Sequence, residues 1–255
     1  MAREKNLQDT TLKEPVDFTL DESKLILRGI AQELDRILQM LHGQTAALSP
    51  CSNGQEENRG EACTPKPEED KRLKKAIAEV RLDPSTANPY LKISPDGRAV
   101  KMDQIVEGAY DPWEGFRRTR HRYDGWWCVL GREGFASGKH YWEMDVRGKM
   151  EWRVGVVRES APRNGFKSLN PKTYHWTLKL QFGRLMAMTV EVTKLASCAP
   201  SVLGVFLDME EGNVSFYDVR NTFYIYSFNV SFNLDEKIFP VFGTVETRRE
   251  MRILN

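Results

Sequence analysis

The fold is decided by residues 202–217, which read VLGVFLDMEEGNVSFY. Val202–Leu207 and Val214–Tyr217 are rich in β-branched and aromatic residues, and such runs are typical of strands. Between them lies the polar segment Glu210–Asn213, whose glycine suits a tight turn. The stretch therefore predicts a β-hairpin, the basic unit of an antiparallel sheet.

Short strands of the same kind are predicted along the chain from Tyr90 to Phe242. Turn signals such as Pro95–Gly97 and Arg147–Lys149 separate them. Many short strands at this spacing are typical of an all-β sandwich or barrel. The predicted strands are Tyr90–Ile93, Ala99–Met102, Trp127–Leu130, His140–Val146, Trp152–Val157, Tyr174–Leu180, Leu185–Val190, Val202–Leu207, Val214–Tyr217, Phe223–Phe228 and Ile238–Phe242.

Large apolar side chains are expected in the core of these strands. In residues 140–146 the alternation predicts that Trp142, Met144 and Val146 face inward. Trp152, Phe206 and Phe216 are expected in the core as well. Cys128 lies in a predicted strand, so we expect its thiol to be buried and unreactive.

The first 70 residues differ from the rest in composition. They carry 14 acidic and 8 basic residues, and their one aromatic residue is Phe18. Because aromatic side chains dominate protein cores, we expect no independent globule here. Apolar residues from Leu27 to Leu41 recur at alternating spacings of three and four. This predicts, over residues 19–42, an amphipathic helix that docks on the rest of the chain or a short coiled coil that pairs chains.

The predicted organisation has five parts. Residues 1–18 are expected to be disordered, and residues 19–42 form the helix or coiled coil. Residues 43–67 are rich in Gly, Pro, Ser and Glu and read as a flexible linker. Residues 68–80 are expected to form a short helix, and residues 81–255 the β domain.

Composition and missing motifs exclude several classes of protein. No run of about 18 apolar residues is present, so no membrane span is predicted, and residues 1–15 lack the apolar core of a secretory signal. The four cysteines form no C-x-x-C pair, which argues against a zinc-binding module. A net charge of +1 argues against a dedicated nucleic-acid binder. The few, widely spaced cysteines favour a reduced, cytoplasmic setting. Hydrolase, metalloprotease and P-loop motifs are absent, so we expect a chain that is not an enzyme and needs no cofactor or metal.

Four stretches resemble the motifs of the PRY-SPRY family. Residues 80–91, VRLDPSTANPYL, resemble the opening PRY motif, and residues 129–143, VLGREGFASGKHYWE, resemble the SPRY signature. Residues 152–158, WRVGVVR, and residues 205–217, VFLDMEEGNVSFY, resemble two later SPRY strands. The four occur in the family's order, so the chain is identified as a member of it. Arg158 and Asp208 stand in two of these motifs, and we expect them to form a structural polar pair.

The resemblance implies a fold and a role. The fold is a bent two-sheet antiparallel β-sandwich, as at the C-terminus of tripartite-motif ubiquitin ligases and in butyrophilin cytosolic tails. The role is a non-catalytic adaptor that binds a protein partner through variable loops, in ubiquitin-ligase or innate-immune pathways. Two alternatives stay open. One is a shortened ligase relative that works through a RING-bearing partner bound by residues 19–42. The other is a butyrophilin-like sensor of a small anionic ligand.

The loops that the family uses for binding are basic or polar in this chain. If they converge, they form a positive basin that favours an acidic or phosphorylated epitope, because arginine pairs well with carboxylate and phosphate. The alternative is that scattered arginines only keep the domain soluble. Trp126 is a candidate aromatic anchor at a loop edge. The candidate partner-binding residues are Arg117, Arg118, Arg120, Trp126, Arg153, Arg163, Lys167, Lys179, Gln181, Arg248 and Arg249.

Overall fold

The computed structural model describes residues 67–103, 121–232 and 235–255. The predicted tail at 1–18, the helix or coiled coil at 19–42 and nearly all of the linker at 43–67 lie outside the described residues. The same holds for Arg117, Arg118 and Arg120. All described residues belong to one structural unit, residues 51–255.

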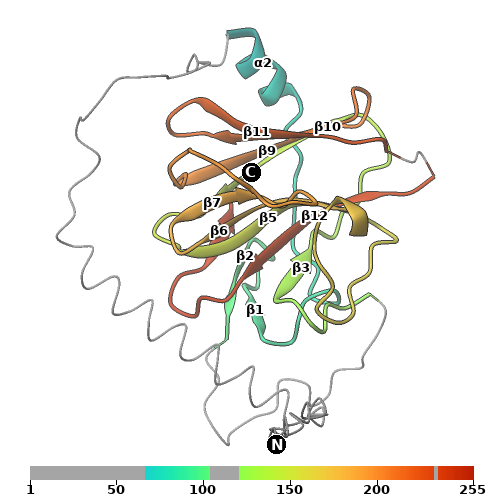
Figure 1. Cartoon of the computed structure of the whole chain (residues 1–255), viewed down its shortest axis with the longest axis vertical. Helices are drawn as coiled ribbons and strands as arrows, with labels where there is room; N and C mark the ends of the chain where they lie inside the picture. Colours follow the sequence, from blue (N-terminus) through green and yellow to red (C-terminus); the bar gives the residue numbers. More distant parts are fainter. Residues whose placement is uncertain (1–66, 104–120, 233–234) are drawn as a thin grey trace, which may run out of the picture. The chain divides into compact units, whose positions relative to one another are not determined.

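Within the described residues, thirteen strands form two antiparallel sheets (Figure 1). The seven-stranded sheet contains, in spatial order, β1 (Leu91–Ile93), β2 (Ala99–Met102), β13 (Met251–Ile253), β4 (Lys139–Asp145), β9 (Val202–Asp208), β10 (Asn213–Asp218) and β11 (Phe223–Asn229). The six-stranded sheet contains β3 (Cys128–Leu130), β12 (Ile238–Thr244), β5 (Glu151–Arg158), β6 (His175–Gln181), β7 (Arg184–Ala187) and β8 (Thr193–Lys194). The helical elements are α2 (Pro67–Lys75) and a single 3-10 turn, Pro171–Thr173. The predicted all-β sandwich is confirmed.

The hairpin that decides the fold is β9–β10. Val214 lies opposite Leu207 in the ladder, and Gly212 adopts a φ of 68° in the connecting turn. That left-handed conformation favours glycine, which explains the turn signal in the sequence. Two strands have no counterpart among the predicted ones, β8 and β13. β8 has two residues and β13 has three, so both are too short for their patterns to predict a strand.

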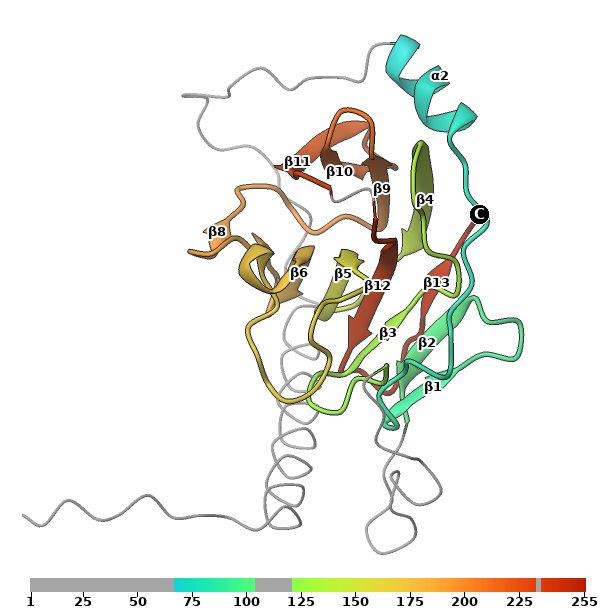
Figure 2. The same ribbon diagram turned by 90° about the vertical axis from the view of Figure 1, so that its right-hand side faces the viewer.

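The core between the two sheets contains the residues expected there. Trp142, Met144 and Val146 are fully buried in it, as predicted from the alternation, together with Trp152 and Phe216. Figure 2 shows the two layers from the side, with β4 and β13 in one and β5 and β12 in the other.

A short helix, α2, packs on the outer face of the seven-stranded sheet. It begins at Pro67, one residue before the helix predicted over residues 68–80, and ends at Lys75, five residues before the predicted end. Leu73 and Ala76 pack with Tyr141, Phe206 and Tyr217 in a separate buried cluster. Figure 2 shows α2 next to β4. Phe206 is therefore buried, but on the face opposite to the main core.

Asp208 and Arg158 do not pair with each other, so that prediction is wrong. Asp208 accepts from Arg72 of α2 at 2.5 Å and from Lys139 at 2.9 Å. Arg158 lies 4.0 Å from Glu236 instead. Asp208 binds Arg72 of α2 instead of Arg158. The two residues are 136 positions apart, and no local sequence pattern predicts that they meet.

The outer face of the six-stranded sheet carries a third buried cluster, in which Tyr123, Leu169 and Ala161 from the connecting segments pack on Cys128 and Val157. Because both faces of this sheet are covered here, seven of the eight residues of β5 are buried. This cluster fixes the segments that surround the candidate site. Among the described residues, no helix has the length and apolar character that crossing a membrane requires.

Candidate partner-binding site

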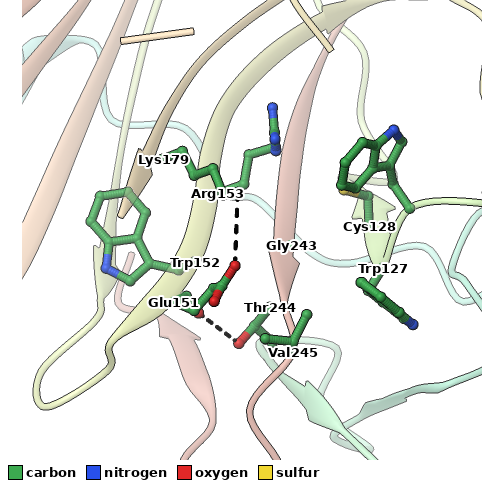
Figure 3. A pocket seen from close by; sticks show the side chains of 10 residues that line it. Trp127, Cys128, Glu151, Trp152, Arg153, Lys179, Gly243, Thr244 and Val245 are labelled. Carbon is green, nitrogen blue, oxygen red and sulfur yellow. Dashed lines mark hydrogen bonds and ion pairs between the residues drawn. The ribbon is translucent and has the colours of Figure 1, made fainter. Parts of the chain in front are cut away.

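A small pocket opens on the outer face of the six-stranded sheet, beside the third cluster. In the register of the sheet, Cys128, Gly243, Arg153 and Lys179 lie side by side on four neighbouring strands. A side chain at Gly243 would approach the Cys128 Sγ and the Trp127 carbonyl oxygen to 2.9 Å, so the glycine allows β3 and β12 to pack closely at the floor of the pocket. The pocket has a volume of about 50 Å³. Its lining residues are Trp126, Trp127, Cys128, Glu151, Trp152, Arg153, Lys179, Gly243, Thr244 and Val245 (Figure 3).

Three aromatic rings form one rim of the pocket. The ring of Phe166 lies edge-to-face with Trp126 at 5.5 Å and with Trp127 at 6.4 Å. Phe166 is 51% exposed, and both tryptophans are half-buried. The indole Nε1 of Trp126 donates to the Lys167 carbonyl at 2.7 Å, which ties this rim to the segment after β5. Partly exposed aromatic rings that are held in place are typical anchors of protein interfaces.

The guanidinium of Arg153 is held by acceptors of this chain. It donates to the Leu169 carbonyl at 3.2 Å and to the Thr177 hydroxyl at 3.4 Å, and it lies 5.5 Å from the Trp126 ring centroid. The residue is buried, and this burial lowers the pKa of Arg153. Arg153 therefore supports the wall of the pocket and does not extend into solvent.

Lys179, Gln181 and Glu151 form a polar triangle at the other side of the pocket. Lys179 Nζ donates to Gln181 Oε1 at 2.8 Å and lies 3.8 Å from Glu151 Oε1, which also accepts from Gln181 Nε2 at 3.2 Å. Figure 3 shows the Glu151 carboxylate between Lys179 and Thr244. Burial raises the pKa of Glu151, an effect that the positive charge of Lys179 opposes and the nearby Glu246 carboxylate reinforces.

The remaining candidate residues have different surroundings. Arg163 is buried and donates to the carbonyls of His121 at 2.9 Å and Glu159 at 3.1 Å, so it stabilises loops. Lys167, Arg248 and Arg249 are exposed. The structure thus gathers Trp126, Arg153, Lys179 and Gln181 around one pocket, while Arg117, Arg118 and Arg120 lie outside the described residues.

Three residues of this surface were missed by the sequence analysis: Glu151, Phe166 and Gly243. An aromatic residue in the otherwise polar loop after β5 was a usable signal for Phe166. Glu151 and Gly243 carry no such signal, because their roles depend on the strand register.

Buried titratable groups lie behind the pocket. The Tyr123 hydroxyl is 3.2 Å from His175 Nε2, and burial lowers the pKa of His175 to about 4. Cys128 is buried as predicted, and burial raises the pKa of its thiol to about 11. A neutral imidazole and a neutral thiol at physiological pH suit a structural role here. In the described part of the chain, no group of three His, Cys, Asp or Glu residues is arranged to hold a metal ion.

Comparisons with known proteins identify the domain that carries this pocket. The model of the SPRY-associated domain, PRY, matches residues 80–135, and the model of the SPRY domain matches residues 139–254. The chain carries a PRY-SPRY domain. The two models together take in every strand described above, so the pocket belongs to the PRY-SPRY domain.

Relatives with this domain include ligases and butyrophilins. The human E3 ubiquitin-protein ligase TRIM58 is 38% identical over 165 residues, which cover 63% of this chain and 32% of TRIM58. Human butyrophilin subfamily 1 member A1 is 37% identical over 157 residues, which cover 61% of this chain and 28% of that protein. The chain thus matches about a third of the length of these curated relatives. The crystal structure of the TRIM65 PSpry domain matches 78% of this chain with a TM-score of 0.62 at 22% identity, which shows the fold alone.

Proposed function

We propose that this chain is a protein-recognition module whose PRY-SPRY domain grips a partner protein at the pocket beside Trp126. The observation that carries the proposal is the rim itself, where Trp126 and Trp127 line the pocket and Phe166 packs against both, all three with partly exposed rings. PRY-SPRY domains are generally binding modules, and the prediction that the chain is not an enzyme is kept as part of the proposal.

The rigidity of the surroundings supports this role. The pocket is lined from β3, β5, β6 and the end of β12, so its walls are set by the register of one sheet. A preorganised site loses little conformational entropy when a partner binds. We therefore expect binding without rearrangement of the sandwich.

An acidic or phosphorylated epitope would meet only part of the predicted basic set. Lys167, Arg248 and Arg249 are exposed and available to carboxylate or phosphate groups of a partner. Arg153 and Arg163 already donate to carbonyls of this chain. Electrostatic attraction would therefore come from these three exposed basic residues. It would raise the association rate more than the affinity.

A small anionic ligand fits the pocket less well than a protein surface does. The Glu151 carboxylate lies within the pocket and repels an anion, and the Lys179 amine is already bonded to Gln181. The described residues thus favour recognition of a protein partner over the sensing of a small anionic ligand.

The test is affinity purification from cell extract with the full 255-residue chain as bait. Phe166→Ala removes an exposed ring, and Trp126→Ala removes its neighbour. The matched control is Tyr224→Ala, which removes an exposed aromatic residue from β11 in the other sheet. A partner captured by the wild type and the control, but lost by both rim variants, supports the proposal. A partner captured equally by all four proteins would place the binding surface elsewhere.

A further inference from the structure

Glu151, which lines the pocket, has a carboxylate oxygen that the described chain leaves without a partner. Glu151 is 8% exposed, and its Oε1 accepts from Gln181 and faces Lys179. Its Oε2 is buried and has no hydrogen-bond partner among the described residues. Buried carboxylate oxygens without a donor are rare and costly, so this atom marks a place where a donor belongs.

The donors around the pocket do not serve this oxygen. Arg153 gives its hydrogen bonds to Leu169 and Thr177, and Lys179 gives its closest one to Gln181. Thr244 donates its hydroxyl to the Glu151 carbonyl, not to the carboxylate. In Figure 3 the dashed lines from Glu151 run to Lys179 and Thr244, and Oε2 carries none.

The charges nearby decide which kind of donor fits. Arg153 and Lys179 both bring positive charge to the pocket and act on Glu151 electrostatically. The carboxylates of Glu151 and Glu246 already balance these two charges, so a partner ammonium or guanidinium would bring an unbalanced positive charge. A partner carboxylate would be repelled by Glu151. An uncharged N–H or O–H group avoids both penalties.

We propose that the pocket selects a partner side chain that is uncharged and ends in a hydrogen-bond donor, with Glu151 Oε2 as the acceptor and the tryptophan rim as the apolar contact. This inference rests on the proposed function and names the chemistry that the same site reads. Glu151 is then the specificity-determining residue of the site, and partner binding supplies the hydrogen bond that its Oε2 lacks in the folded chain.

The test uses a phage-displayed library of short random peptides, selected on the full 255-residue chain. Selected peptides are expected to share Ser, Thr, Asn or Gln at one fixed position, because a pocket of about 50 Å³ is too small for an aromatic ring. Their affinity for the Glu151→Gln variant should fall about tenfold or more, because the amide nitrogen turns an acceptor into a competing donor. The matched control is Glu250→Gln, which makes the same charge change at an exposed site and should leave affinity unchanged.

A double-mutant cycle separates recognition from damage to the fold. Replacing the donor of the peptide by an apolar isostere, for example Thr by Val, should weaken binding to the wild type by the same factor but should not weaken binding to Glu151→Gln further. Additive losses would overturn the inference. A fixed position occupied by Asp, Glu, Lys or Arg, or by purely apolar residues, would also overturn it.

The outcome also distinguishes the inference from the proposed function. Peptides whose binding requires Trp126 but is indifferent to Glu151→Gln would leave the recognition surface in place and refute the role of Glu151. Selected peptides that bind Trp126→Ala as well as the wild type, or a selection that yields no peptide, would refute both.

Discussion

Asp208 joins the tip of the β9–β10 hairpin to the outer helix, and its replacement tests how the domain is held together. The side chain is fully buried. Its Oδ1 accepts from the backbone N–H groups of Glu210 at 3.1 Å and Glu211 at 3.0 Å, and its Oδ2 accepts from Arg72 and Lys139. Two replacements separate these contributions. Asp208→Ala removes both sets of bonds, whereas Asp208→Asn keeps an oxygen for the turn and removes the ion pairs.

The magnitudes follow from these contacts. Hydrogen bonds to a charged acceptor contribute about 1.5–3 kcal/mol each, so the two backbone bonds together contribute roughly 3 kcal/mol at the lower end of that range. The ion pairs add little, because the side chains of Arg72 and Lys139 are 42% and 31% exposed and water screens them. Asp208→Ala should therefore lower the free energy of unfolding by about 3 kcal/mol, or Tm by about 6–12 °C for a domain of this size. Asp208→Asn should cost about 1–2 kcal/mol, because it removes the ion pairs and its neutral oxygen accepts the two turn bonds less strongly than a carboxylate does.

Thermal unfolding followed by circular dichroism measures both effects. Asp145→Ala serves as the control, because Asp145 is on the neighbouring strand β4 and its ion-pair partner is the exposed Arg147 two residues away. Asp145→Ala loses one exposed hydrogen bond from the Arg147 backbone N–H, at 3.0 Å, so its Tm should fall by at most about half as much as that of Asp208→Ala. Equal losses for Asp208→Asn and Asp208→Ala would refute the argument, since the ion pairs and not the turn would then hold the hairpin.

The pH dependence of the same residue has a definite sign. Burial by itself raises the pKa of Asp208, but the Glu211 amide and the Lys139 and Arg72 side chains outweigh it and hold the pKa below its usual value. A carboxylate with a lowered folded-state pKa stabilises the fold at all pH values above its unfolded pKa. That contribution disappears as the pH falls through the folded-state pKa. The stability gap between the wild type and Asp208→Ala should therefore narrow in strong acid.

Two further changes test the six-stranded sheet. Gly155→Ala should lower the free energy of unfolding, measured in urea, by more than about 3 kcal/mol. The new Cβ would lie 2.1 Å from the Trp176 carbonyl oxygen and 2.7 Å from the Thr177 Cα, and these backbone atoms cannot move aside. A loss below about 1 kcal/mol would contradict this close approach. In mass-spectrometric alkylation with iodoacetamide at mildly alkaline pH, the exposed Cys198 should react well before Cys128, whose burial raises its thiol pKa to about 11. Modification of both thiols at equal rates would show that the third cluster opens readily.

The sequence was most informative where a local pattern decides the structure. The β9–β10 hairpin could be predicted because Gly212 and the flanking strands lie within one short stretch. The inward side of β4 followed from its alternation, and Trp142 and Met144 are buried accordingly. β13 could not be predicted, because its three residues are too few for an alternation to be recognised, although Met251 and Ile253 are buried in the core.

The site was less predictable, because its properties arise from long-range register. Arg153 and Lys179 were identified as candidates, but their neighbours in space were not visible. Arg153 meets a carbonyl from a loop that follows its own strand, and Lys179 meets Glu151 across the β5–β6 pair. Arg163 is a similar case, since its burial and its carbonyl acceptors are properties of the folded chain that no local pattern shows.

The position of α2 has a practical consequence for how the domain can be presented. The helix covers the outer face of the seven-stranded sheet, whereas the pocket opens on the outer face of the six-stranded sheet. Pro67, where α2 begins, therefore belongs to the side of the sandwich that faces away from the recognition surface. A domain immobilised or fused just ahead of Pro67 would present the Trp126 rim to solution, and a partner could dock without steric competition from the attachment.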